Sequence, residues 1–149
     1  MKKTRVYLLI FYCLISACSN EKAEYSEIIK TVTKSNHTST TSYSDIIILP
    51  ELGCEGCISD VENFLISNSQ SLENTFFILT RIRSKKLLRL RVGEDVLNQE
   101  HVYLDTENLF ESSEIHSIYP IRLVLNQQGD IEEILKKDPS NMSFFNDLH

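Results

Sequence analysis

The sequence predicts an α/β fold in which helices cover a mixed central sheet, and three observations support this prediction. Continuous apolar runs at 46–49 and 75–80 are typical of strands buried on both faces. Between them, apolar residues recur from position 57 to 65 at helical spacing. The turn at 126–130 separates two further apolar runs and predicts an antiparallel hairpin. Strands that alternate with helices and close with a hairpin indicate both parallel and antiparallel neighbours in one sheet.

The first 20 residues have the features of an export leader. Positive charges at Lys2, Lys3 and Arg5 precede an apolar stretch, 6–15, that is too short to span a bilayer comfortably. The stretch ends in Leu14-Ile15-Ser16-Ala17-Cys18, which resembles the lipobox of bacterial lipoproteins.

That resemblance implies a signal peptide over 1–17, cleaved before Cys18. It also implies that Cys18 carries the acyl chains, palmitate among them. The protein would then be lipid-anchored in the bacterial cell envelope, facing the periplasm or the surface, and Ser19 favours the outer membrane. The alternatives are a transmembrane anchor and a plain secretory signal in which Cys18 has no role.

The segment 18–44 is mostly polar, and we expect the lipidated cysteine to be followed by a flexible tether here. Within it, 27–32 is compatible with a short helix or an added strand. The folded domain is expected over 45–149, with one hydrophobic core.

The remaining elements follow from local patterns. Residues 84–93 are ambiguous, because the Ser84 N-cap and Gly93 favour a helix whereas alternation over 88–92 favours a strand; we expect mainly helix. Further predicted elements are a strand at 102–105, a helical turn at 107–110, strands at 121–125 and 131–135, and a last helix capped by Ser140 that buries Phe144, Phe145 and Leu148.

The charge balance excludes nucleic acid as an expected partner. The formal net charge is −6, and removal of a leader carrying three cations would make it −9. One local exception is a basic stretch that we expect to form a solvated face, with contact to anionic headgroups as the alternative. It contains Arg81, Arg83, Lys85, Lys86, Arg89 and Arg91.

The cysteines give the main indication of function. If Cys13 leaves with the leader and Cys18 carries lipid, Cys54 and Cys57 remain, in an oxidising compartment. They can pair, but the loop between them is so small that loop-closure entropy contributes little stability. Such pairs are more often redox-active or metal-binding than structural.

With its motifs in order over 45–137, the chain resembles the thioredoxin-like family, in particular the membrane-anchored thiol–disulfide oxidoreductases of bacterial envelopes. The matching pieces are a buried strand, a CxxC at the head of a helix, a second buried strand, a proline before a strand, and a final hairpin. The resemblance implies a thioredoxin-like three-layer sandwich. It assigns attack to Cys54 and resolution to Cys57, and it makes Tyr119 and a cis Pro120 the residues that bind the substrate chain.

Several positions depart from that family. Gly53 stands where a tryptophan is usual, Tyr119 replaces the common Thr or Val, and Glu55-Gly56 is the inner dipeptide. We expect Glu55, with Glu51 close by, to raise the pKa of Cys54 and to favour a reductase or exchange role. No buried acid–base residue that assists Cys57 is evident.

Two other interpretations remain open. The segment 52–65 also resembles the heavy-metal-associated domain of copper chaperones, in which two thiolates would bind Cu(I) and 87–92 would be a strand. That domain usually has Met where this chain has Leu52, and it leaves 102–135 unexplained. In the other interpretation, the CxxC is a structural clip on a thioredoxin-like binding module. We favour exchange with protein thiols or disulfides of the envelope, with no metal and no cofactor.

Overall fold

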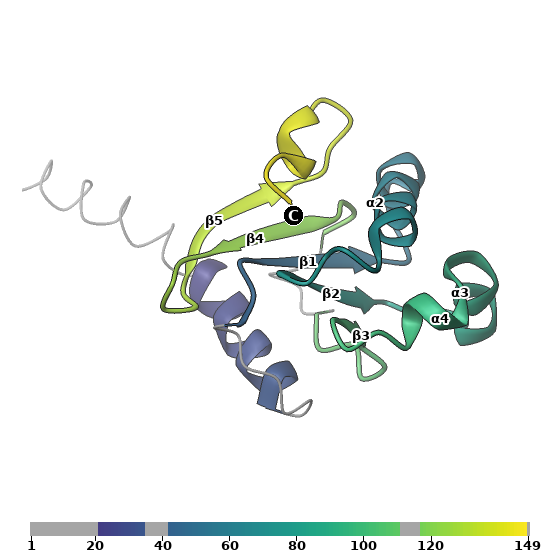
Figure 1. Cartoon of the computed structure of the whole chain (residues 1–149), viewed down its shortest axis with the longest axis horizontal. Coiled ribbons are helices and arrows are strands. Elements are labelled where there is room, and N and C mark those ends of the chain that lie inside the picture. Colours follow the sequence, from purple (N-terminus) through teal and green to yellow (C-terminus); the bar gives the residue numbers. More distant parts are fainter. Residues whose placement is uncertain (1–20, 35–41, 111–116, 149) are drawn as a thin grey trace, which may run out of the picture.

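Three ranges of the chain, 21–34, 42–110 and 117–148, are described by the structure, a computed structural model. Residues 21–34 are helical. The elements that follow are β1 (Asp45–Pro50), α2 (Glu55–Asn68), β2 (Thr75–Thr80), α3 (Lys85–Val92), α4 (Glu94–Leu97), β3 (Val102–Leu104), β4 (Ile121–Leu125), β5 (Ile131–Lys136) and the 3₁₀ helix η2 (Met142–Phe145), as Figure 1 shows.

The five strands form one mixed sheet in the order β3-β2-β1-β4-β5. β1, β2 and β3 are parallel, whereas β4 is antiparallel to β1 and β5 is antiparallel to β4. Pro50 lies opposite Thr80, and Ile48 lies opposite Ile121, the first residue of β4. The loops after β1 and β2 therefore meet the loop before β4 at one edge, which we call the Pro50 edge. The prediction of an α/β fold with a mixed sheet is confirmed.

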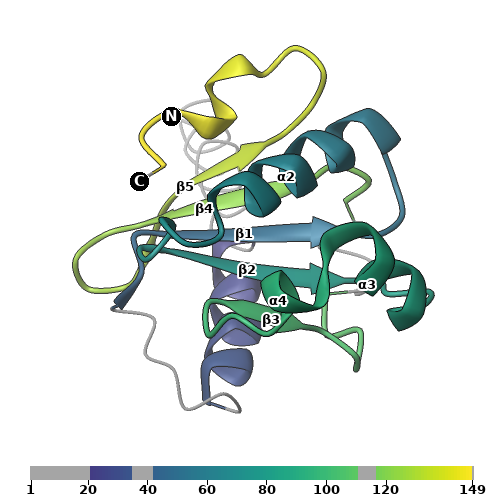
Figure 2. The ribbon, with the colours of Figure 1, turned by 45° about the vertical axis from the view of Figure 1, so that its right-hand side comes forward.

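Both faces of the sheet are buried, as the continuous apolar runs predicted. Side chains alternate along a strand, so neighbouring residues of β1 enter two separate apolar clusters. Ile47 and Leu49 join the cluster that α2, α3 and η2 cover, whereas Ile46 and Ile48 join the cluster that helix 21–34 covers. Figure 2 shows α2 and α3 on the near side of the strands and helix 21–34 on the far side.

Helix 21–34 corrects the expectation of a flexible tether over 18–44. Tyr25, Ile29 and Val32 are buried against the sheet, and their spacing of four and three residues places them on one helical face. Burying three large apolar side chains stabilises a helix whose sequence is otherwise polar. The folded unit therefore begins at least as early as residue 21 rather than at 45, and the option of a helix at 27–32 is confirmed.

The ambiguous stretch 84–93 is helical, as expected. Ser84 caps α3 by accepting a hydrogen bond from the Leu87 N–H, and Gly93 ends it with a positive φ of 95°. The predicted helical turn at 107–110 is a non-helical turn instead, since the Asp105 carboxylate accepts hydrogen bonds from the Leu109 and Phe110 N–H groups. The last helix is a short 3₁₀ turn capped by Asn141, not Ser140, although Phe144 and Leu148 are buried as expected.

Ile29→Ala is expected to lower the free energy of unfolding by about 3 kcal/mol, because it leaves a cavity under the sheet at a side chain that is 4% exposed. Urea denaturation measures the change. Lys30→Ala, at the exposed neighbouring position of the same helix, should stay within about 0.5 kcal/mol of wild type. Equal stability of the Ile29→Ala variant and wild type would show that helix 21–34 does not pack on the sheet.

Candidate functional site

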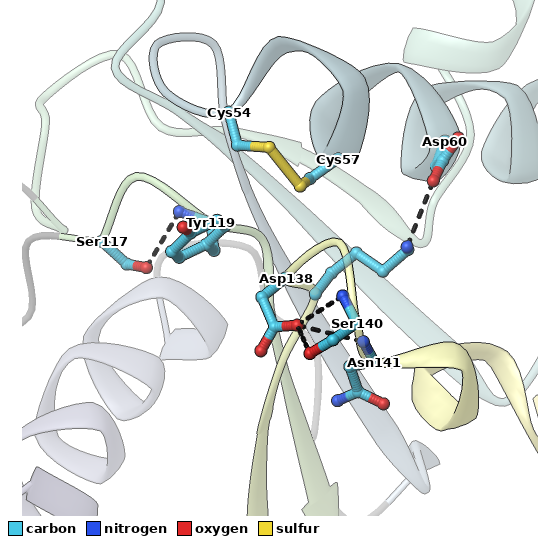
Figure 3. Close-up of a disulfide and its surroundings, with 9 residues drawn as sticks. Cys54, Cys57, Asp60, Ser117, Tyr119, Asp138, Ser140 and Asn141 are labelled. Carbon is cyan, nitrogen blue, oxygen red and sulfur yellow. Dashed lines mark hydrogen bonds and ion pairs between the residues drawn. A yellow bond between two sulfur atoms is a disulfide. The ribbon is translucent and has the colours of Figure 1, made fainter.

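Cys54 and Cys57 lie at the Pro50 edge and form a disulfide, with their Cα atoms 5.3 Å apart (Figure 3). The two sulfur positions differ in access. Cys54 is half-buried in the turn before α2, whereas Cys57 is 3% exposed and belongs to the apolar face of α2 with Ile58 and Val61. A partner molecule can therefore reach Cys54 more readily than Cys57.

Cys54 is the N-cap residue of α2. Its carbonyl accepts the first helical hydrogen bond, from Ile58 N–H at 2.9 Å, and its side chain makes no capping hydrogen bond. The first N–H groups of a helix have no intrahelical partners, and the positive end of the helix dipole lies there. Both effects favour the thiolate of a cysteine at this position.

The loop before β4 contacts the CxxC turn through its backbone. The Cys54 N–H donates to the Ile118 carbonyl at 2.7 Å. The same carbonyl oxygen would lie 2.0 Å from a Cβ built on Gly53, which is closer than any side chain tolerates. Gly53 is therefore required by this close approach. The tryptophan that is usual before the first cysteine of thioredoxin-like proteins does not fit here.

Arg81 ties the same two loops together. Its guanidinium donates to the Leu52 carbonyl at 2.9 Å and to the Ser117 carbonyl at 3.4 Å. Arg81 follows β2 directly and has a left-handed φ of 57°, so backbone strain accompanies this placement. The expectation that the basic stretch lies entirely on a solvated face is wrong for Arg81. Sequence reasoning missed it because a carbonyl partner leaves no pattern in the sequence.

The prediction of a cis Tyr119–Pro120 bond is wrong, since the bond is trans. The residue of this loop that hydrogen-bonds to the CxxC turn is Ile118, two residues before the proline. This contact forms with the Tyr119–Pro120 bond in trans, which is the preferred isomer. Pro120 is buried and its carbonyl accepts from the Lys137 N–H at 2.9 Å. Tyr119 is half-buried, and its N–H donates to Ser117 Oγ at 3.1 Å. Both predicted substrate-binding residues thus lie on the loop that touches the CxxC turn.

The carboxylates near the cysteines are largely paired. Arg91 contacts Glu62 at 2.8 Å and Glu51 at 3.7 Å, and Glu51 also accepts a hydrogen bond from the Arg83 N–H. Arg91 and the Arg83 N–H therefore weaken the negative field that Glu51 was expected to place near Cys54, whereas the effect of Glu55 and Glu51 on the pKa of Cys54 stays a prediction. Glu55 remains as an exposed carboxylate beside Cys54.

A groove of about 400 Å³ runs beside the CxxC turn. Its lining includes Gly53 and Glu55 on one side and Arg83 and Arg91 on the other. It therefore links the start of α2 with α3 and runs past the residues on either side of Cys54.

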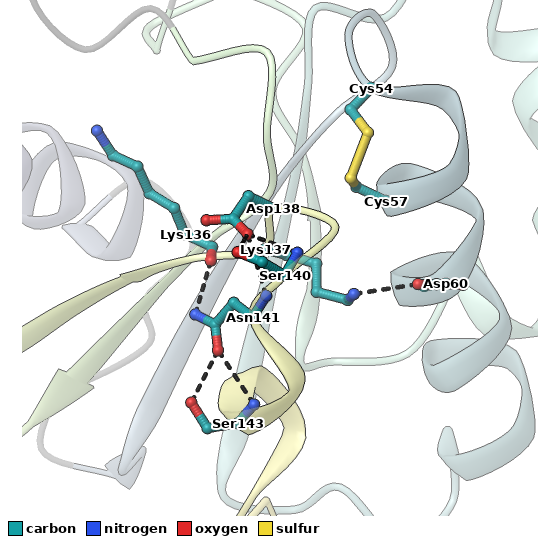
Figure 4. Close-up of polar contacts among 9 residues, drawn as sticks. All are labelled: Cys54, Cys57, Asp60, Lys136, Lys137, Asp138, Ser140, Asn141 and Ser143. Carbon is teal, nitrogen blue, oxygen red and sulfur yellow. Dashed lines mark hydrogen bonds and ion pairs between the residues drawn. A yellow bond between two sulfur atoms is a disulfide. The ribbon is translucent and has the colours of Figure 1, made fainter.

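Lys137 is a second residue that sequence reasoning missed. It is buried, and its Nζ lies 3.1 Å from Asp60 and 5.8 Å from the centre of the Phe145 ring (Figure 4). Asp60 comes three residues after Cys57, so it lies one turn along the same side of α2. A mostly buried cation therefore lies near the helix turn that carries the second cysteine, where the sequence had indicated no acid–base group.

The turn after Lys137 is ordered by one carboxylate. Asp138 accepts hydrogen bonds from Ser140 Oγ, from the Ser140 N–H and from the Asn141 N–H. These bonds, the Ser140 hydroxyl first, lower the pKa of Asp138. The turn carries the chain from β5 into η2, on the α2 side of the sheet (Figure 3).

Gly53→Ala is expected to destabilise the oxidised protein by about 1–3 kcal/mol, since the added Cβ displaces the Ile118 backbone. Chemical denaturation measures the effect. Gly56→Ala, three residues away, is the matched control: no atom lies within 4 Å of its Cβ, and alanine in the first turn of α2 should stabilise by about 0.5–1 kcal/mol. Effects of the same sign at both positions would contradict the close approach of the loop.

Comparisons with protein-family models, with curated proteins and with solved structures found no match to this chain. Among the residues that the structure describes, no helix is long and apolar enough to cross a membrane. The same residues contain no group of three or more His, Cys, Asp or Glu side chains placed to hold a metal ion. Cys18 lies outside the described ranges.

Proposed function

We propose that the Cys54–Cys57 pair performs thiol–disulfide exchange with protein partners. The observation that carries this proposal is the difference in access between the two cysteines, since Cys54 is only half-buried at a helix N-terminus and Cys57 is buried. Exchange needs one sulfur that a partner can reach and a second that meets only the mixed disulfide.

The reaction balances without a cofactor. In the reduced protein, the Cys54 thiolate attacks one sulfur of a partner disulfide, forms a mixed disulfide, and releases the partner's other sulfur as a thiolate. The Cys57 thiolate then attacks Cys54 Sγ and releases the first partner sulfur. The partner gains two electrons and the Cys54–Cys57 disulfide forms, and the reverse sequence oxidises a partner dithiol.

The proposal extends to the fold type and to the cellular location. The CxxC turn leads from β1 into α2, β2 lies parallel to β1 on one side, and the antiparallel pair β4–β5 lies on the other side. This arrangement supports a thioredoxin-like assignment. The helix at 87–92 counts against the copper-chaperone alternative, which needs a strand there. The lipobox-like residues before Cys18 support a lipid anchor in the bacterial envelope, outer membrane favoured.

Cys57→Ala should accumulate mixed disulfides between Cys54 and envelope proteins, because the resolving sulfur is missing. Non-reducing electrophoresis followed by mass spectrometry detects these adducts. Cys54→Ala is the matched control and should trap far less, since Cys57 is buried.

Preferential trapping by Cys54→Ala would reverse the roles of the two cysteines. Trapping by neither variant, together with tight Cu(I) binding by the reduced wild-type protein, would overturn the exchange function in favour of the metal site.

Cys18→Ala should release the protein from the membrane fraction or leave it unprocessed, because the acyl chains would have no attachment point. Fractionation and the mass of the mature protein measure the outcome. A variant that stays on the membrane with the wild-type mature mass would refute the lipid anchor while leaving the exchange proposal intact.

A further inference from the structure

The outer side of α3 carries two exposed leucines. Leu87 is 59% exposed and Leu90 is 75% exposed, whereas Leu88 and Val92 of the same helix are buried under the sheet. Leu87 and Leu90 are three residues apart, so they are neighbours on the helix surface. The inner side of α3 accounts for its packing in the fold, and the outer pair contributes nothing to that core.

Cations surround this leucine pair. From position 75 to 93 the chain has six Lys or Arg and no Asp or Glu, within a protein of net charge −6. Three of the six interact inside the fold: Arg81 binds loop carbonyls, Arg91 pairs with Glu62, and Arg89 pairs with Glu94.

The other three cations are Arg83, Lys85 and Lys86. They are exposed, and no ion pair among the described side chains involves them. With Leu87 and Leu90 they define what we call the α3 surface.

The α3 surface borders the segment that carries Cys54. The groove of about 400 Å³ is lined by Gly53 and Glu55, the residues on either side of Cys54 in the sequence, and by Arg83, whose N–H donates to Glu51. Glu55 is exposed at the CxxC segment, and the exposed carboxylates directly after α3 are Glu94, which pairs with Arg89, and Asp95.

The α3 surface also lies away from the beginning of the described chain. Lys22 donates to the Glu132 carbonyl, at the end of the sheet where β1 starts, whereas α3 follows the Pro50 edge (Figure 1). The α3 surface and the first described residues thus lie towards opposite ends of the sheet.

We propose that the α3 surface docks the exchange partner, a protein with carboxylates and an aliphatic side chain next to its reactive disulfide. This proposal rests on the exchange function proposed above. Complementary charge raises the rate of encounter and orients the partner's disulfide towards Cys54. The leucine pair then supplies an apolar contact that is buried only in the complex.

The test uses two disulfide-linked peptides that differ only in the flanking residues, which are Glu and Leu in one and Lys and Ser in the other. We expect reduced wild-type protein to react at least about tenfold faster with the acidic peptide at low salt, and the difference to collapse in 0.5 M salt. Lys85→Glu with Lys86→Glu should abolish the preference, and Leu87→Ser with Leu90→Ser should slow the acidic peptide alone. Lys30→Glu with Lys34→Glu, on exposed positions of helix 21–34, changes the net charge equally and should keep the preference.

A small neutral disulfide, 2-hydroxyethyl disulfide, separates the two proposals. If wild-type protein reacts with neither it nor the peptides, the exchange function itself fails. If wild type and all variants reduce it equally but show no peptide preference, or if the helix 21–34 control loses the preference as well, the docking surface is refuted. Binding to phosphatidylglycerol vesicles that needs Lys85 and Lys86, without any peptide preference, would replace the protein partner by a membrane.

Discussion

The site depends on one backbone contact, the approach of the Ile118 carbonyl to the CxxC turn. This oxygen accepts the Cys54 N–H and occupies the space that a side chain at position 53 would need. It connects the loop before β4 to the loop after β1, two segments more than sixty residues apart in the chain. The need for glycine at position 53 and the direct link between the helix start and the loop before β4 both follow from this contact.

Arginines determine how the surrounding charges act. Arg91 pairs closely with Glu62 and lies 3.7 Å from Glu51, so its one positive charge offsets part of the charge of these two carboxylates. Arg81 instead donates hydrogen bonds to the carbonyls of Leu52 and Ser117. These bonds connect the loop after β1 to the loop before β4, the same two loops that the Ile118 contact joins. The effect of Glu51 on Cys54 therefore cannot be judged from their proximity in the sequence alone, because Arg91, the cation near Glu51, comes from another element, α3.

The parts of this fold that were predicted correctly depend on local patterns. Apolar runs indicated β1 and β2, and the Ser84 and Gly93 caps indicated α3. Helix 21–34 was foreseen only as an option over 27–32 inside an expected flexible tether, because the polar composition around Tyr25, Ile29 and Val32 outweighed the helical spacing of these three apolar residues. Contacts between distant residues had no local signal. Examples are the trans Pro120 loop, the Lys137–Asp60 pair, and Arg122, which is buried within β4 by its pair with Asp45 at 2.7 Å.

The order of attack that we propose at the disulfide rests on where the sheet places it. β1 has six residues, so roughly 20 Å separates its start, near Lys22 and Glu132, from the Pro50 edge. The disulfide therefore lies at the end of the sheet away from the beginning of the described chain. At that end Cys57 is turned inward with the apolar face of α2, which packs on the sheet, and Cys54 precedes the helix. In the exchange that we propose, a partner approaching from outside would meet Cys54 first, and Cys57 would react with that partner only through the bond that Cys54 had formed.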